Sequence, residues 1–161
     1  MARPRSFVLA LVMFAATIGA CAGNMGVVPT SECSSGLQWL GGDSGNALMH
    51  PGRDCTGCHA SAGKGPLYAL AGTVFGDAAA KDDCYGRTDV VVRVTGADGK
   101  FVDLTPNGAG NFTARSGVVL PYTAELRRGE TVVRKMQTAQ TSGACNGCHT
   151  AEGSSGRIVA P

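Results

Sequence analysis

The sequence predicts a mainly β fold, a small antiparallel sandwich flanked by two irregular segments. Two features of the composition point this way. Glycine makes up 24 of 161 residues, about twice its usual share, and aromatic residues make up only 6%. The third observation is a series of short runs rich in β-branched and aromatic residues, separated by turn signals. A chain of this length fits one small domain with short appendages.

The expected strands follow one another in the middle of the chain. In the fifth run, Tyr122, Ala124 and Leu126 alternate with polar residues, which is the period of a strand with one buried face. Two turn dipeptides, Asp-Gly at 98–99 and Asn-Gly at 107–108, separate neighbouring runs. The six expected strands, within a sandwich of residues 69–139, span 70–76, 89–96, 100–105, 110–115, 121–129 and 130–137.

The N-terminal residues 1–20 have the pattern of a signal peptide, a short basic start followed by an apolar run too short to span a membrane comfortably. The run ends in "IGAC", residues 18–21, which resembles the lipobox of bacterial lipoproteins. That resemblance implies cleavage before Cys21 and lipidation of this cysteine, with ordinary cleavage nearby as the alternative. We therefore expect an exported, lipid-anchored protein that faces the periplasm or the cell surface, with residues 21–48 as a flexible tether.

The motif Cys-x-x-Cys-His occurs twice, once in each flanking segment, 49–68 and 140–161. It is the attachment signature of c-type haem. The two thiols reach the vinyl groups on one edge of the porphyrin, and the histidine binds the iron from below. A four-cysteine zinc site would bring its two pairs closer together in sequence, and a thioredoxin-like pair would need a βαβ pattern that the sequence lacks.

The two motifs resemble those of dihaem and multihaem c-type cytochromes. That resemblance implies two covalent haem c groups, each held by two thioethers and one proximal histidine. Haem 1 would be carried by Cys55, Cys58 and His59, and haem 2 by Cys145, Cys148 and His149.

The distal ligands are expected among few residues. The third histidine, His50, lies five residues before the first motif, and Met136 follows the last expected strand. Histidine nitrogen and methionine sulfur both bind haem iron, and methionine raises the potential relative to a second histidine. One bis-histidine haem through His50 and one His/Met haem through Met136 would result. Spacing does not decide whether His50 serves haem 1, haem 2 or a neighbouring subunit, and Met136 as core filling is the alternative.

Two cysteines remain, Cys33 and Cys84, and a disulfide between them is the simplest assignment for an exported chain. It would attach the N-terminal stretch to the folded body, at a chain-entropy gain of about 4 kcal/mol. Free thiols or pairing between chains are the alternatives.

The region from 69 to 137 also resembles the carboxypeptidase-regulatory-like, or prealbumin-like, domains of exported bacterial proteins. The resemblance rests on "LAGTVFG", "DVVVRVTGADGKF", "NGAGNFTA" and "PYTAELRRGE". It implies an Ig-like or prealbumin-like sandwich that serves as a binding or spacer module, and it implies no activity.

Electron transfer is the function that these features favour, with other redox proteins or cytochromes as partners and the membrane reached through the lipid anchor. A peroxidase-like haem enzyme with one open iron is a second candidate, although the chain is short for it. A structural or binding subunit of a haem-containing assembly, such as a homo-oligomer, is a third. Without Arg3 and Arg5 of the signal peptide, basic and acidic residues balance at twelve each, and no basic tract indicates nucleic-acid binding.

The strand count also predicts where the motifs lie. Six short-linked strands that reverse direction in turn return the chain to the end where it began. Both motifs should then lie together, with Met136 beside them and the turns at Gly99 and Arg128 at the opposite end of the sandwich.

Overall fold

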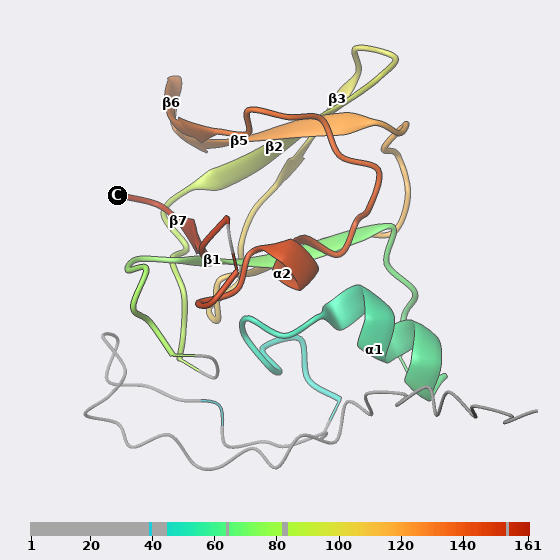
Figure 1. Ribbon diagram of the computed structural model, residues 1–161, viewed down its shortest axis with the longest axis vertical. Coiled ribbons are helices and arrows are strands. Elements are labelled where there is room, and N and C mark those ends of the chain that lie inside the picture. Colours follow the sequence, from blue (N-terminus) through green and yellow to red (C-terminus); the bar gives the residue numbers. More distant parts are fainter. Residues whose placement is uncertain (1–38, 40–44, 64, 82–83, 154) are drawn as a thin grey trace, which may run out of the picture.

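The computed structural model describes residues 39, 45–63, 65–81, 84–153 and 155–161. This part of the chain forms two sheets and two short helices (Figure 1). The helices are α1 (Cys55–Ala62) and α2 (Cys145–Cys148). The strands are β1 (Leu70–Phe75), β2 (Val91–Gly96), β3 (Phe101–Leu104), β4 (Asn111–Ala114), β5 (Tyr122–Arg128), β6 (Thr131–Lys135) and β7 (Ile158–Val159).

The sheets have three and four strands, in the orders β4-β1-β7 and β3-β2-β5-β6. The expectation of a mainly β protein with two sheets is confirmed, and the first six strands begin and end within two residues of their expected bounds. In the larger sheet, β2 pairs antiparallel with β3 and β5, and β5 pairs antiparallel with β6.

The core lies between the two sheets. Alternate residues of β2, Val92 and Val94, point into it because successive side chains of a strand face opposite sides. They meet Leu70 and Val74 of β1 and Phe112 of β4 in one cluster. All six residues of β1 are buried, since this strand has a neighbour on each side and both helices pack against it.

Three expectations about the flanking segments were wrong. The first segment is not irregular but contains α1, a helix of eight residues. The second segment is not entirely irregular either, because it contains α2 and because β7 joins the smaller sheet. The sheets are also not entirely antiparallel, since β7 runs parallel to β1, with Val74 paired to Ile158 and Phe75 to Val159.

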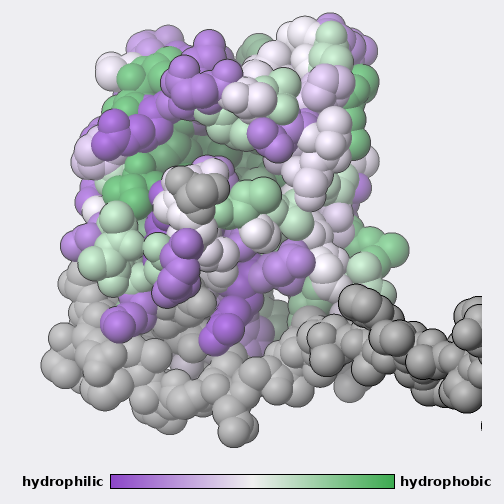
Figure 2. Space-filling model, viewed as in Figure 1, coloured by the Kyte–Doolittle hydropathy of each residue, from purple (hydrophilic) through white to green (hydrophobic). Residues whose placement is uncertain are grey.

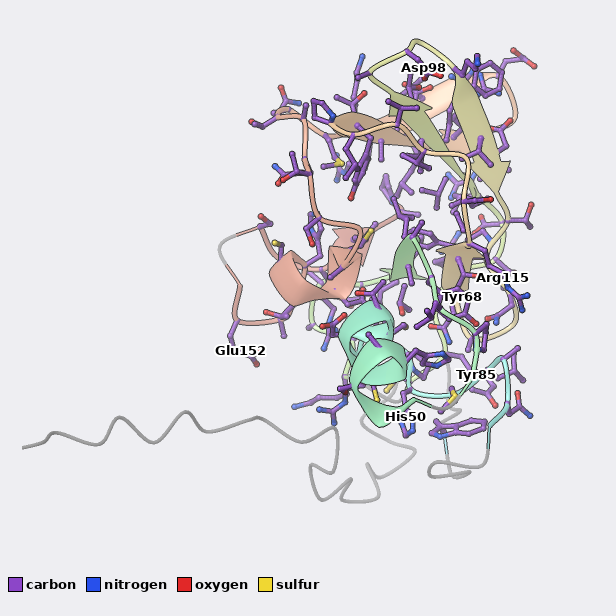
Figure 3. The ribbon with its side chains drawn as sticks, turned by 90° about the vertical axis from the view of Figure 1, so that its right-hand side faces the viewer. His50, Tyr68, Tyr85, Asp98, Arg115 and Glu152 are labelled. Carbon is purple, nitrogen blue, oxygen red and sulfur yellow. The ribbon has the colours of Figure 1, made fainter. Side chains whose placement is uncertain are left out.

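The expected grouping of the motifs is confirmed. Both helices pack against β1 and lie next to each other in two perpendicular views (Figures 1 and 3). The β2–β3 turn, marked by Asp98 in Figure 3, lies at the far end of the molecule from α1. The expectation that the turn at Arg128 lies at the same end as Gly99 was wrong, because antiparallel pairing of β2 with β5 places Arg127 opposite Val91 and Tyr122 opposite Gly96. The physical reason for the grouping is not the even number of strands that reverse direction in turn. The two segments lie together because both pack against the same strand, β1.

The expected signal peptide, the lipidation site Cys21 and the cysteine Cys33 lie outside the described residues, as does nearly all of the expected tether. In the described ranges, no helix is long and apolar enough to cross a membrane.

Candidate haem-attachment site

The first motif lies on α1, and its neighbours explain why a helix forms there. Asp54 is the N-cap residue, and its Oδ1 accepts hydrogen bonds from the Gly57 amide (3.0 Å) and the Thr56 hydroxyl (2.8 Å). Gly63 ends the helix in the left-handed conformation (φ 61°), which glycine adopts without strain. The helix sets Cys55 and Cys58 three residues apart, so their side chains share one face.

The second motif is attached directly to β1. The Ala71 amide donates to the Gly143 carbonyl (2.9 Å), and Ala71 and Ala144 form a parallel bridge. The chain then makes the single turn of α2. Gly72 leaves room for it, because a Cβ there would lie 2.8 Å from the Cys145 Cβ. The tight fit positions Cys145 against the strand.

Both motif histidines are held in the same way. Nδ1 of His59 lies 2.8 Å from the Pro66 carbonyl oxygen, and Nδ1 of His149 lies 3.0 Å from the Gly156 carbonyl oxygen. Each carbonyl comes seven residues after its histidine. Since a carbonyl only accepts, the proton is on Nδ1, and Nε2 carries the lone pair that a metal needs. Orientation of a ligating histidine by a backbone carbonyl is the usual arrangement at metal sites.

Further contacts fix the ring of His59. Gly65 lies against it, and a Cβ at this position would come within 2.9 Å of the ring carbon Cε1. Tyr68, labelled in Figure 3, is on the neighbouring segment, with its ring centroid 5.0 Å from that of His59. The ring is therefore confined from more than one side.

The four motif cysteines are free thiols. Burial raises the pKa of Cys55 to about 11, and the Asp54 carboxylate acts in the same direction. Burial also raises the pKa of Cys145 to about 11, and the nearby thiols of Cys55 and Cys148 contribute. Both thiols are protonated at neutral pH, unlike the thiolate nucleophiles of cysteine enzymes. A thioether sulfur carries no charge, so conversion to thioethers suits this environment.

A cavity of about 730 Å³ opens beside the second motif, between the larger sheet and β7. Its walls include core residues of both sheets, among them Val94, Phe112 and Leu126, and also Cys145, Cys148 and His149. Figure 2 shows an apolar hollow on this face, between the upper layer of strands and the α2 segment below it. The volume lies within the range of ~300–1,000 Å³ that is typical of cofactor and ligand pockets.

Met136 lines this cavity together with the second motif. The Met136 amide donates to the Ala124 carbonyl (2.9 Å), which holds the residue beside β5 just after β6 ends. The structure thus places the motif histidine, two thiols and a thioether on the lining of one cavity. The donor set and the space fit a haem c group at this motif.

His50 is placed elsewhere. It lies in the turn that leads to α1, where its carbonyl accepts from the Arg53 amide (3.1 Å), and Figure 3 shows it near the lower end of that helix. Its φ of 47° is unusual for a residue other than glycine. Its ring contacts Trp39 edge-on, with 6.1 Å between centroids. In the described part of the chain, the residues that line the cavity of the second motif do not include His50.

Cys84 is disulfide-bonded and fully buried. The other described cysteines are free, so its partner lies outside the described residues, and the pairing with Cys33 stays a prediction.

Sequence reasoning missed three residues that shape the site. The Tyr122 hydroxyl donates to the Ser142 carbonyl (2.8 Å) and lies 3.9 Å from the Cys145 sulfur. Burial raises the pKa of Tyr122 far above its usual value, so this hydroxyl stays neutral. Thr73 and Asn146 form buried hydrogen bonds across the site. Asn146 could have been noticed because it lies between the two cysteines of the second motif. Haem attachment sets no requirement on the residue type at that position, so a polar side chain there needs another explanation.

No protein-family model matches the chain, and neither does any curated protein or solved structure. The geometry of the site therefore carries the functional argument by itself.

Proposed function

We propose that the protein is a dihaem c-type cytochrome that transfers single electrons. The observation that carries this proposal is the matched pair of hydrogen bonds from His59 and His149 to backbone carbonyls, each of which leaves Nε2 as the metal-binding atom. Each histidine directly follows a pair of free thiols. Two unlike segments, one on a helix without buried residues and one paired with β1, share this arrangement.

The residues of each site have distinct tasks. Cys55 and Cys58 would hold haem 1 and His59 would bind its iron, while Cys145, Cys148 and His149 would do the same for haem 2. When bound, haem supplies an iron that alternates between the ferric and ferrous states. The mostly apolar walls of the cavity would pack against the haem of the second site, and Met136 is the residue available as its distal ligand. His50, near the lower end of α1, is the candidate distal ligand for haem 1.

Localisation and partners are proposed from the sequence. The signal peptide and Cys21 support export and a lipid anchor, and covalent attachment prevents loss of the cofactor outside the cytoplasm. Other redox proteins are the expected partners. The order of strands along the chain and the two-sheet arrangement are compatible with an Ig-like or prealbumin-like sandwich, which we propose as the finer description of the fold.

Ligand binding by the reduced protein tests electron transfer against the enzymatic alternative. The protein is produced in a host that attaches haem to exported proteins, and its spectrum is recorded before and after addition of carbon monoxide. If both irons have two protein ligands, the ferric spectrum is low-spin and carbon monoxide leaves the ferrous spectrum nearly unchanged. Rapid binding of carbon monoxide by the wild-type protein would contradict the electron-carrier proposal and favour an enzyme with an open iron.

A further inference from the structure

Along one edge of β1, a side chain forms one of the hydrogen bonds that a neighbouring strand would normally form. The Ala71 amide donates to the Gly143 carbonyl, and the Ala160 amide donates to the Phe75 carbonyl, both at 2.9 Å. Between these two backbone bonds, the Thr73 amide donates to the side-chain Oδ1 of Asn146 at 3.0 Å. An asparagine side chain thus takes the place that a strand residue would hold in the ladder.

The other end of the same amide reaches the first motif. Asn146 Nδ2 donates to the Arg53 carbonyl oxygen at 2.9 Å and to the Thr73 hydroxyl oxygen at 3.1 Å. Arg53 lies two residues before Cys55, and Asn146 directly follows Cys145. A single side chain therefore connects the backbone beside one haem motif to the other motif.

Thr73 makes this connection a network. Its hydroxyl donates to Asn111 Oδ1 (2.7 Å) and accepts from the Gly52 amide (2.8 Å), and Asn111 Nδ2 donates to the Met49 carbonyl (2.9 Å). The side chains of Thr73 and Asn146 are buried, with residue exposures of 0% and 3%. Buried polar groups that are fully paired make a site rigid, whereas an unpaired one is costly.

The side-chain amide of Asn146 fits this hydrogen-bond network in one orientation. The Thr73 amide needs an acceptor and the Arg53 carbonyl needs a donor, so only one orientation of the Asn146 side chain satisfies both. Aspartate would offer no donor to Arg53, and leucine would leave both backbone groups unpaired. At the matching position of the first motif, Thr56 bonds only locally, to its own helix cap.

We infer that Asn146 and Thr73 form an interlock that holds the two haem motifs at a fixed separation and orientation, and so serve as positioning residues for electron exchange between the two haems of one chain. This inference rests on the proposed function. The closeness of the motifs supports it, because Asn146 Nδ2 of the second motif lies 2.9 Å from the Arg53 carbonyl oxygen beside the first motif. The interlock is distinct from the axial ligands, since neither residue offers a metal-binding nitrogen or sulfur.

The test is the distance distribution between the two ferric haems, measured by pulsed electron paramagnetic resonance on holoprotein whose mass shows two haems. We expect one narrow distribution in the wild type and a broadened or shifted one in Asn146→Ala. Thr73→Val, which keeps the shape but loses the hydroxyl, should also broaden it, and Thr73→Ser should restore the narrow distribution. If Asn146→Ala does not fold, the comparison of Thr73→Val with Thr73→Ser decides alone.

Asn107→Ala is the matched control. Asn107 also anchors the segment before the first motif, through a 2.7 Å hydrogen bond from Nδ2 to the Ala47 carbonyl, while its Oδ1 accepts from the Ala109 and Asn111 amides and not from the second motif. This variant should lose thermal stability and keep the narrow distribution. Unchanged distributions in Asn146→Ala and Thr73→Val, with both haems attached, would overturn the interlock. A wild-type chain without covalent haem would instead contradict the proposed function.

Discussion

At the scale of single residues, the site is built from side chains whose polar atoms are directed by the backbone. The carbonyls of Pro66 and Gly156 set the tautomers of the two motif histidines, so Nε2 is the nitrogen left available to a metal. Gly65 and Gly72 contribute by having no side chain, since a Cβ at either would push into His59 or Cys145. Substitution of these glycines would displace the ligands without changing the motif itself.

A prediction for a single residue concerns Met136 as the distal ligand of haem 2. It shares the cavity of the second motif, so Met136→Ala should open the haem-2 iron to carbon monoxide or lower its potential. Met136→His should keep the low-spin spectrum and lower the potential by on the order of 100 mV, a modest part of the ~0.8 V that axial ligands span. Spectroelectrochemical titration measures both effects.

Met49→Ala is the control for this prediction, because Met49 is the other described methionine and does not line that cavity. It should leave the haem-2 potential unchanged. If Met136→Ala keeps the wild-type spectrum and potential, Met136 is only part of the core packing.

At the scale of secondary-structure elements, the two motifs have different supports. α1 has no buried residue and is held by its caps, Asp54 and Gly63. α2 is a single turn between two stretches that pair with β1, at residue 144 before it and at β7 after it. The cavity next to α2 is walled by core residues, and its lining includes no residue of α1. Haem 2 would therefore complete the core, and haem 1 would lie beside it.

This difference predicts unequal effects on stability. Cys145→Ala with Cys148→Ala removes both thiols of the second motif, so haem 2 is lost and the apolar cavity walls are exposed to water. The free energy of unfolding falls by about 1.5–3 kcal/mol for each fully exposed apolar side chain. The Tm should fall by about 10 °C or more, since 1 kcal/mol corresponds to roughly 2–8 °C across domains of about 60–250 residues and several apolar side chains line the cavity. Cys55→Ala with Cys58→Ala also removes one haem and serves as the matched comparison, with a smaller fall. Calorimetry on both double variants measures the two falls in Tm, and equal falls would contradict the unequal roles of the two motifs.

The elements also explain what the sequence could predict. The first six strands were predictable because period-two alternation and turn dipeptides such as Asp98-Gly99 are local signals. α1 was missed because it is short and has no apolar face, so only its caps mark it. β7 was missed because two residues carry no periodicity, and its pairing with β1 depends on contacts more than 80 residues apart in the chain. The motif residues were visible in the sequence, but the partners of Asn146 belong to distant segments.

At the scale of the whole molecule, β1 organises the site. Its antiparallel partner β4 and the parallel stretches around α2 occupy its two edges, and α1 packs against it as well. The sandwich is thus the frame that brings both motif segments together, and not only a spacer between them. For the proposed cytochrome, this arrangement favours electron exchange within one chain over exchange between subunits.

Intact mass under denaturing and reducing conditions shows whether two haems are covalently attached to the chain. The wild-type chain should carry the mass of two haem groups that survive denaturation. Each double variant, Cys55→Ala with Cys58→Ala or Cys145→Ala with Cys148→Ala, should carry one haem fewer, because thioether bonds are its only covalent link. A wild-type chain that retains no haem, or only one, when produced beside a functioning haem-attachment system would contradict the account.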